Sequence, residues 1–510
     1  MFNIQSFFFF KILLELNFYF LFFSILISAL IFYFTKYFGN IFFFRSFSLF
    51  IFLKFFIILY IIIYFFLFFF FFILYIIYIY TFYYNFYYPN LILIPNLSNI
   101  CCIYLFNFLN FSWFKFYLSI DFFGMILVFL AYIIGFMSLL TLDSRLYWRN
   151  VKYYFSFSIF LFIVYLFVSS SNLIFFFLLY ELLLVPSFLF VYFISPSRRS
   201  IQASIYFIIW TQIGSFLVLC VITYIVSTFS CFEFSSLRFI KLTSFESFFI
   251  YFILFLGFGF KIPIWPFHYW LTKTHVEAPS GFSIYLSGFL VKSALYGFYK
   301  ITNMLCFDVN SSFFLLICFI GVFDASLKMW GQTDLKKLAA YGTIQEMNLI
   351  YLILNWGDSN IIVSAILFTA THAFLSALMF FAVDCIYKRF NSRFLIDLSG
   401  ILHLNPNLAI FIFFIIIFFA GLPGTIKFSV EFYIFCGFLE ISISSCFILM
   451  LIANVFGLIG FCKCWFNAIF GVNKHILKYI PMDLTIKEFY FFFFSFFFLF
   501  FFSFFINFLF

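Results

Sequence analysis

The sequence of 510 residues is 67% hydrophobic, 29% aromatic and 9% charged, and its net charge of +9 is not gathered into a basic tract typical of nucleic-acid binding. A soluble domain carries about 25% charged residues and a disordered chain is poor in aromatic residues, so both classes are excluded. The apolar runs are long and continuous, whereas membrane β-barrel strands alternate in polarity over about ten residues, so an all-α polytopic membrane protein is predicted.

Fourteen membrane-spanning helices are predicted, because a helix needs about 20 apolar residues to cross the hydrocarbon core. The predicted span 404–443 is too long for one straight crossing and contains Gly-Leu-Pro-Gly at 421–424, so a broken helix around Pro423 is expected. The spans are placed at 16–38, 55–80, 119–142, 151–170, 172–194, 202–228, 245–269, 280–301, 311–331, 334–356, 358–388, 404–443, 444–469 and 486–510.

Basic residues are distributed unevenly between the predicted loops. Of the 27 Lys and Arg residues, 17 lie in loops after odd-numbered spans, and five lie in the N-terminal segment or in loops after even-numbered spans. The positive-inside rule therefore places the odd-numbered loops on the cytoplasm-equivalent side and both termini on the opposite side. The remaining five are lysines inside spans: Lys261, Lys292, Lys328, Lys427 and Lys463.

Four parts of the chain are predicted. Residues 1–116 form an N-terminal extension with two membrane helices, because their charges lie at helix ends. Residues 117–301 hold span 3 and a first set of five spans, 302–470 hold a second set of five, and 471–510 form a loop and an anchor helix. Because five is an odd number, the two sets enter the membrane from opposite sides, as inverted repeats with broken helices do in transporters.

Ionisable residues in the middle of spans are functional candidates, because a charge at the bilayer centre costs about 2.5–3.5 kcal/mol. Glu181 lies mid-helix in span 5. Lys261 is followed by Pro263, Pro266 and His268, and proline lacks the amide hydrogen that an unbroken helix needs. An interrupted helix is predicted here, which survives at membrane depth only where it lines a cavity or packs against protein. The plainer interpretations are a protonated, hydrogen-bonded Glu181 and a Lys261 that caps its helix.

Five further candidates lie in the later spans. Lys292 is in the middle of span 8, too deep to reach the membrane surface easily, and Glu346 and His372 are interior positions of spans 10 and 11. Glu431 follows the second break, and Lys427 lies four residues before it on the same helical face, where the two can pair. The plainer interpretations are a purely local Lys427–Glu431 pair and a His372 that only fills space.

The sequence has no motif for nucleotide, phosphate or haem binding, and its eleven cysteines show no CxxC spacing. The spacing of the candidates repeats, since Glu181 precedes Lys261 by 80 residues and Glu346 precedes Glu431 by 85. A row of Glu, Lys and His side chains inside membrane spans suits the transfer of protons better than that of a large substrate.

Several motifs taken together resemble the antiporter-like subunits of respiratory complex I, over roughly residues 119–470. The carboxylate of Glu431 and the motif at 275–280 favour the chain 4 branch of these subunits over the related chains 2 and 5. The motifs are Ser119-Ile120-Asp121, Tyr180-Glu181 to Pro186, Lys261 to His268, His275-Val276-Glu277-Ala278-Pro279-Ser280, Leu290-Val291-Lys292, Asp334 to Tyr341, Thr371-His372 and Gly421 to Phe432.

The resemblance implies two inverted five-helix bundles that carry a proton relay. The family usually has a histidine where this chain has Glu346, so a carboxylate replaces an imidazole. The implied relay residues are Glu181, Lys261, Lys292, Glu346, His372 and Glu431. The residues expected to support them are Pro263, Pro266, His268, His275, Glu277, Pro423 and Lys427.

The resemblance also implies partners and a location. NADH oxidation and ubiquinone reduction would occur in other subunits, so no flavin, iron–sulfur cluster or metal ion is expected in this chain. The expected partners are other membrane-arm subunits, including chains 2 and 5, lipids such as cardiolipin, and a respiratory supercomplex, but no nucleic acid. The expected location is the mitochondrial inner membrane, with both termini on the intermembrane-space side.

Two other functions remain open on the residues alone. The first is a stand-alone cation/proton antiporter, whose ion chemistry would need the same buried charges. The second is a structural scaffold in which the buried charges no longer carry protons.

Overall fold

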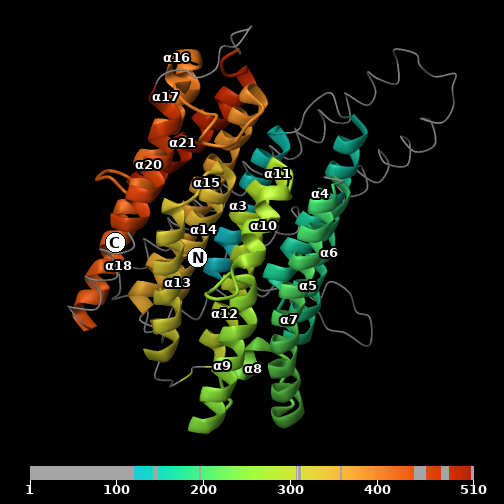
Figure 1. Ribbon diagram of the computed structural model, residues 1–510. Coiled ribbons are helices and arrows are strands. Elements are labelled where there is room, and N and C mark those ends of the chain that lie inside the picture. Colours follow the sequence, from blue (N-terminus) through green and yellow to red (C-terminus); the bar gives the residue numbers. More distant parts are fainter. Residues whose placement is uncertain are drawn as a thin grey trace, which may run out of the picture. The chain divides into compact units, whose positions relative to one another are not determined.

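The computed structural model describes residues 120–141, 147–194, 197–305, 307, 312–356, 359–441, 455–471 and 482–506. The predicted spans 16–38 and 55–80 lie outside the described residues. In the described ranges the regular structure is helical, with two isolated β-bridges, as Figure 1 shows. Six helical stretches there are long and apolar enough to cross a membrane: Phe122–Leu139, Leu173–Tyr192, Arg198–Phe229, Ser244–Lys261, Phe313–Trp330 and Ile361–Phe390.

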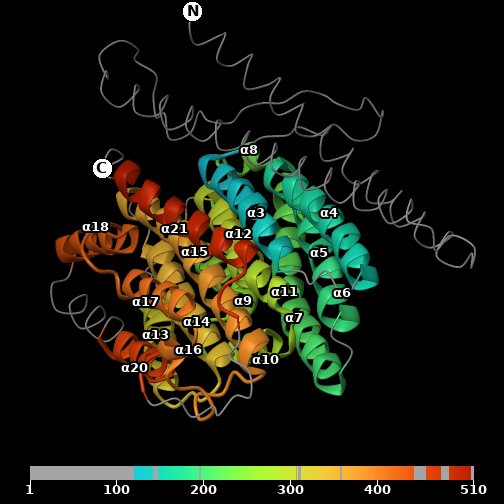
Figure 2. The same cartoon turned by 90° about the horizontal axis from the view of Figure 1, so that it is seen from above.

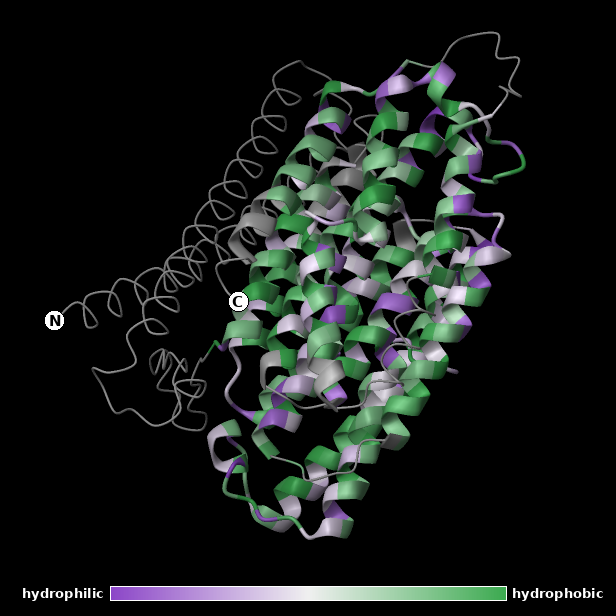
Figure 3. Ribbon diagram, turned by 90° about the vertical axis from the view of Figure 1, so that its left-hand side faces the viewer, coloured by the Kyte–Doolittle hydropathy of each residue, from purple (hydrophilic) through white to green (hydrophobic). Residues whose placement is uncertain are grey.

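Hydropathy follows the helices in the way a membrane protein requires. Figure 3 shows hydrophobic residues along most of the helix lengths and hydrophilic residues gathered toward helix ends and connecting loops. Isolated hydrophilic positions also occur partway along helices, where hydrogen bonding and pairing must offset the cost of burial. The chain is thus a polytopic α-helical membrane protein, as predicted.

Two compact units divide the chain, and the first comprises residues 1–194 and 230–237. The predicted span 172–194 is two helices here, separated by a turn at Leu183. Pro186 explains the interruption, because it cannot donate the hydrogen bond that the carbonyl of Leu182 would receive in a continuous helix. The described helices of this unit are α3 (Phe122–Leu140), α4 (Tyr147–Ser169), α5 (Leu173–Leu182), α6 (Leu184–Ile194) and α8 (Phe234–Leu237).

The second unit comprises residues 195–229 and 238–510. Its described elements are α7 (Arg198–Phe229), α9 (Ser244–Lys261), α10 (Tyr269–Glu277), α11 (Ser280–Tyr285), the π-helix η2 (Leu286–Leu290), α12 (Val291–Leu305), α13 (Ser312–Trp330), α14 (Leu335–Trp356), α15 (Ser359–Phe390), α16 (Ile401–Leu404), α17 (Pro406–Ala420), α18 (Ile426–Ile441), α20 (Gly457–Ile469) and α21 (Ile486–Ile506). Figure 2 shows α14 among its neighbours α13, α15 and α20. Side chains of α14 therefore face protein on several sides.

The first predicted break is present, because α9 ends at Lys261 and α10 begins eight residues later. Two carbonyl groups at the break accept hydrogen bonds from side chains of the second unit. Trp270 donates from Nε1 to the carbonyl of Phe260 at 2.9 Å, and Asn348 of α14 donates from Nδ2 to the carbonyl of Pro263 at 3.2 Å. The break is therefore packed against protein, the condition under which irregular backbone persists at membrane depth.

The second predicted break is also present, between α17 and α18. Gly421 and Gly424 have φ values of +66° and +95°, which side-chain-bearing residues rarely adopt, and Pro423 lies between them. Lys427 donates from Nζ to the carbonyl of Phe419 at 2.7 Å. This contact places a cation at the C-terminal end of α17, where the helix dipole favours positive charge.

Helices α7 and α9 cross at two glycines. A Cβ atom on Gly214 would lie 2.5 Å from the carbonyl oxygen of Gly257, and one on Gly257 would lie 2.8 Å from Cγ2 of Val218. Small residues at such a crossing let two helix backbones touch directly. The crossing positions the helix that ends at Lys261.

The last described helix, α21, is held by polar and aromatic contacts with α15. Arg389 donates to Glu488 at 2.5 Å and to the carbonyl of Asp483 at 3.0 Å. The rings of Phe381 and Phe491 stack with centroids 3.6 Å apart. The predicted anchor segment therefore packs against the rest of the second unit, and it also exposes several phenylalanine side chains.

Candidate functional site

Lys292 is the second residue of α12, which follows the π-helix η2, and it is fully buried. Its Nζ donates to the carbonyl oxygen of Ser287, five residues earlier. π-Helical turns inside α-helices occur frequently at functional sites. Here the turn supplies a backbone acceptor to a lysine that the apolar surroundings would otherwise leave unsolvated.

A buried ion cluster, formed by Glu346 of α14, His372 of α15, and Lys427 and Glu431 of α18, lies in the same unit. The Nζ atom of Lys427 is 2.5 Å from Oε1 of Glu346 and 3.7 Å from Oε1 of Glu431. The other carboxylate oxygen of Glu346, Oε2, contacts Nδ1 of His372. The four side chains therefore form one connected series from imidazole to carboxylate to ammonium to carboxylate.

Burial makes the pairing inside this cluster energetically important. The exposed fractions of the side chains are 0% for His372, 5% for Glu346, 7% for Lys427 and 12% for Glu431. An ammonium group has three donors. Glu346 and the carbonyl of Phe419 accept hydrogen bonds from Lys427, and Glu431 adds an ion-pair partner at 3.7 Å. The cluster can thus hold ionised groups away from water, which isolated charges cannot do.

Lys292 and the buried ion cluster interact electrostatically. The charge of Lys292 acts on His372, and the charge of Glu346 acts on Lys292. The second ring nitrogen of His372, Nε2, is buried and has no hydrogen-bond partner in the described part of the chain. The two ring nitrogens of His372 therefore differ, because Nδ1 contacts Glu346 and Nε2 faces no described hydrogen-bonding group.

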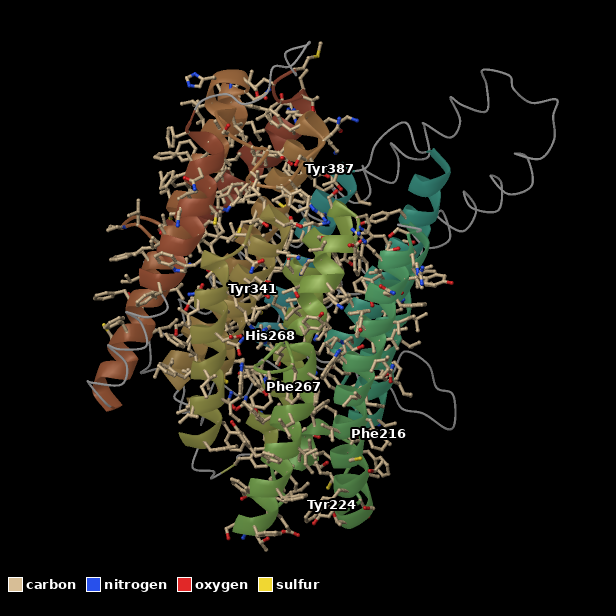
Figure 4. All side chains as sticks on the ribbon, viewed as in Figure 1. Phe216, Tyr224, Phe267, His268, Tyr341 and Tyr387 are labelled. Atoms are coloured by element: carbon tan, nitrogen blue, oxygen red, sulfur yellow. The ribbon has the colours of Figure 1, made fainter. Side chains whose placement is uncertain are left out.

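His268, the residue before α10, contacts a separate ion pair on α13. Its Nε2 lies 3.1 Å from Nζ of Lys328 and 3.4 Å from Oδ2 of Asp324, and Lys328 and Asp324 pair at 2.6 Å. Figure 4 shows His268 and Tyr341 partway along the helices, and their ring centroids are 6.5 Å apart. Asp324 and Lys328 are four residues apart on α13, a spacing at which opposite charges pair on a helix, and His268 joins them from another part of the chain.

The other predicted site residues occupy different places. Lys261 is buried at the C-terminal end of α9, His275 is buried in the last turn of α10, and Glu277 is partly exposed at its end. Glu181 is partly buried in α5 of the first unit, so its place in a relay stays a prediction. Over the described ranges, no three His, Cys, Asp or Glu side chains are grouped to hold a metal ion.

Two hydrogen-bonding positions around the candidate site were not predicted from the sequence. Asn348 satisfies a carbonyl of the first break, and a Cβ on Gly321 would lie 2.3 Å from its Oδ1 atom. An amide side chain two residues after Glu346 in an apolar span was a usable signal. The carbonyl of Ser287 that receives Lys292 had no comparable signal, because a π-helix is not evident from residue types.

Comparison with known proteins places the fold. The family described as NADH:quinone oxidoreductase/Mrp antiporter, transmembrane, matches residues 170–457. NADH-ubiquinone oxidoreductase chain 4 of Paramecium tetraurelia is 47% identical over 375 residues, which cover 74% of this chain and 79% of that relative.

Solved structures share the fold at low sequence identity. A chain of respiratory complex I from Thermus thermophilus with bound NADH has a TM-score of 0.66 and 19% identity, covering 75% of this chain and 81% of that one. A chain of the Mrp complex from Dietzia has a TM-score of 0.63 and 18% identity, covering 70% and 68%. The chain belongs to the NADH:quinone oxidoreductase/Mrp antiporter transmembrane family.

Proposed function

We propose that this chain is a proton-translocating membrane-arm subunit of NADH:ubiquinone oxidoreductase, respiratory complex I. The observation that carries the proposal is the buried series of Lys292, His372, Glu346, Lys427 and Glu431 in a member of this family. Electron transfer from NADH to ubiquinone takes place in partner subunits, which bind the flavin and the iron–sulfur clusters. The chain contributes the proton-moving part of an H⁺-translocating NADH:ubiquinone reductase.

The relay residues have distinct roles in this proposal. Glu181 and Lys261 deliver protons to Lys292, whose ammonium group then passes a proton toward His372. Glu346 receives it beside Lys427, which holds the local charge balance, and Glu431 releases it. The protonation states of neighbouring relay groups are coupled. A change in the protonation of one group therefore alters the proton affinity of the next.

The chain is a multi-pass membrane protein, and we place it in the mitochondrial inner membrane. The uneven distribution of basic loop residues supports both termini on the intermembrane-space side. The proposed partners are the other membrane-arm subunits, including the related chains 2 and 5, together with cardiolipin and a respiratory supercomplex.

Replacing Lys292 by methionine is expected to lower proton translocation by about 100-fold, the typical contribution of a positioned proton-transfer group. Methionine keeps much of the side-chain volume but cannot carry a proton. The measurement is NADH-driven proton uptake by sealed inner-membrane vesicles. The uptake is divided by the rate of NADH oxidation with ferricyanide as electron acceptor, because that rate reports the amount of assembled enzyme.

The matched control is Lys463→Met, which removes an exposed lysine from α20. We expect it to leave translocation unchanged. Normal translocation in Lys292→Met vesicles would instead support the scaffold interpretation and refute the relay.

A stand-alone cation/proton antiporter is the second candidate, favoured by the structural likeness to a chain of the Mrp complex. Gentle solubilisation of the source membranes separates the two functions. Co-migration with a large NADH-oxidising assembly supports the complex I subunit, and a small particle without that activity supports the antiporter.

A further inference from the structure

Asn348 of α14 is a fully buried amide side chain that bonds two different parts of the second unit. Its Nδ2 atom donates to the carbonyl of Ile344, one turn earlier in α14, at 2.8 Å, and to the carbonyl of Pro263 in the first break at 3.2 Å. An amide nitrogen has two donors, so both are used. The side chain therefore bonds its own helix and the irregular backbone after Lys261 at the same time.

Gly321 of α13 leaves the space that this amide occupies. A Cβ atom on Gly321 would lie 2.3 Å from Oδ1 and 2.7 Å from Cγ of Asn348, so any other residue at this position would displace the amide. Oδ1 is buried and has no hydrogen-bond partner within the described ranges. Leaving a buried acceptor unpaired is costly, and an apolar residue would fill the position without that cost. The use of Asn348 here therefore lies in its donor.

Asn348 differs from the other polar side chains between α9 and α14. Tyr351 donates to a carbonyl in the regular part of α9 at 2.9 Å, and Tyr251 of α9 donates to Oδ1 of Asn355 at 2.5 Å. Those two bonds join helical segments that are continuous at the point of contact. The bond from Asn348 instead ends on the backbone of the break, which has fewer helical hydrogen bonds to hold it in place.

We propose that Asn348 is a positioning residue for proton transfer, which holds the first break, and with it Lys261, in a fixed place relative to α14. The inference rests on the proposed function, in which Lys261 delivers protons to Lys292. Helix α14 also carries Glu346, two residues before Asn348, so one helix both bonds the break and supplies a carboxylate of the buried ion cluster. A shift of the break would move Lys261 relative to the later relay groups, and a misplacement of about 1 Å can slow a reaction 100-fold.

Asn348→Leu tests the donor in the assembled complex, with the vesicle measurement described for Lys292. Leucine has nearly the same shape but no donor, so the carbonyl of Pro263 loses its bond, and we expect normalised proton uptake to fall about 10- to 100-fold. Asn348→Gln keeps an amide donor and is expected to recover a large part of the uptake. Equal loss in both variants would show that the relay does not need the donor, and would overturn the assignment.

Gly321→Ala tests the same bond from α13. Its methyl group is expected to push the amide away from Pro263 and to lower the normalised uptake to a similar extent. Where position 348 already carries Asn348→Ala, Gly321→Ala should cause no further loss, because substitutions that act through one contact are not additive. A full additional loss would contradict the proposal. These variants also decide the matter should Asn348→Leu fail to assemble.

Tyr351→Phe is the matched control, because it removes a buried hydrogen bond between the same two helices away from the break. We expect it to lower the thermal stability of the complex and to leave normalised uptake unchanged. An equal fall of uptake in Tyr351→Phe and Asn348→Leu would assign Asn348 to general packing and refute positioning. Loss of uptake in Lys292→Met together with full uptake in Asn348→Leu would overturn this inference and leave the proposed function standing.

Discussion

Substituting Lys427 by methionine is expected to destabilise the second unit by about 3–5 kcal/mol, the usual cost of removing one partner from a buried ion pair. The substitution leaves the carboxylates of Glu346 and Glu431 buried without the ammonium group that now lies 2.5 and 3.7 Å from them. Proton translocation should be lost as well. The fraction of assembled complex on native gels and its thermal stability measure the first effect, and vesicle proton uptake measures the second.

A double variant separates stability from function at this position. Adding Glu346→Leu to Lys427→Met removes both members of the shorter pair, and apolar replacement of a buried pair is often neutral. We expect assembly to recover while translocation stays absent. An assembled, fully active Lys427→Met complex would contradict the role assigned to the cluster.

Adding a single methyl group at Gly214 is expected to separate α7 from α9 and to destabilise the unit by about 2–3 kcal/mol. The new Cβ atom would lie 2.5 Å from a backbone carbonyl oxygen of Gly257, which has no side-chain freedom to move aside. Thermal unfolding of the purified complex is the measurement. Because α9 ends at Lys261, the displacement should also slow proton translocation.

Gly331→Ala is the control for Gly214→Ala. A Cβ atom at Gly331 would meet nothing within 4 Å, so this substitution is expected to be neutral. Equal stability of the two alanine variants would show that the α7–α9 crossing tolerates separation.

The broken helices could be predicted because their cause is local. Pro263 and Pro266 lack the amide hydrogens that a helix needs, and Gly421 and Gly424 adopt φ values that favour glycine. The mid-span charges were equally visible, since each stands alone in an apolar run. Both features depend on residues close in sequence, and the structure contains both.

The partners of those charges could not be predicted in the same way. Spacing alone favoured a pair between Lys427 and Glu431, yet the closer carboxylate belongs to Glu346, 81 residues away. Likewise His268 reaches Lys328 across 60 residues. Such contacts depend on how helices pack, and the sequence contains no periodic signal for that arrangement.

The π-helix η2 determines how far α12 is rotated about the helix axis relative to α11. An α-helix advances about 100° per residue, so deleting one residue from this turn would rotate Lys292 by that angle relative to everything before it. The ammonium group would then leave the carbonyl of Ser287 and point toward a different neighbour. We therefore expect a change in chain length here to disable the proposed relay as thoroughly as replacing one of its side chains.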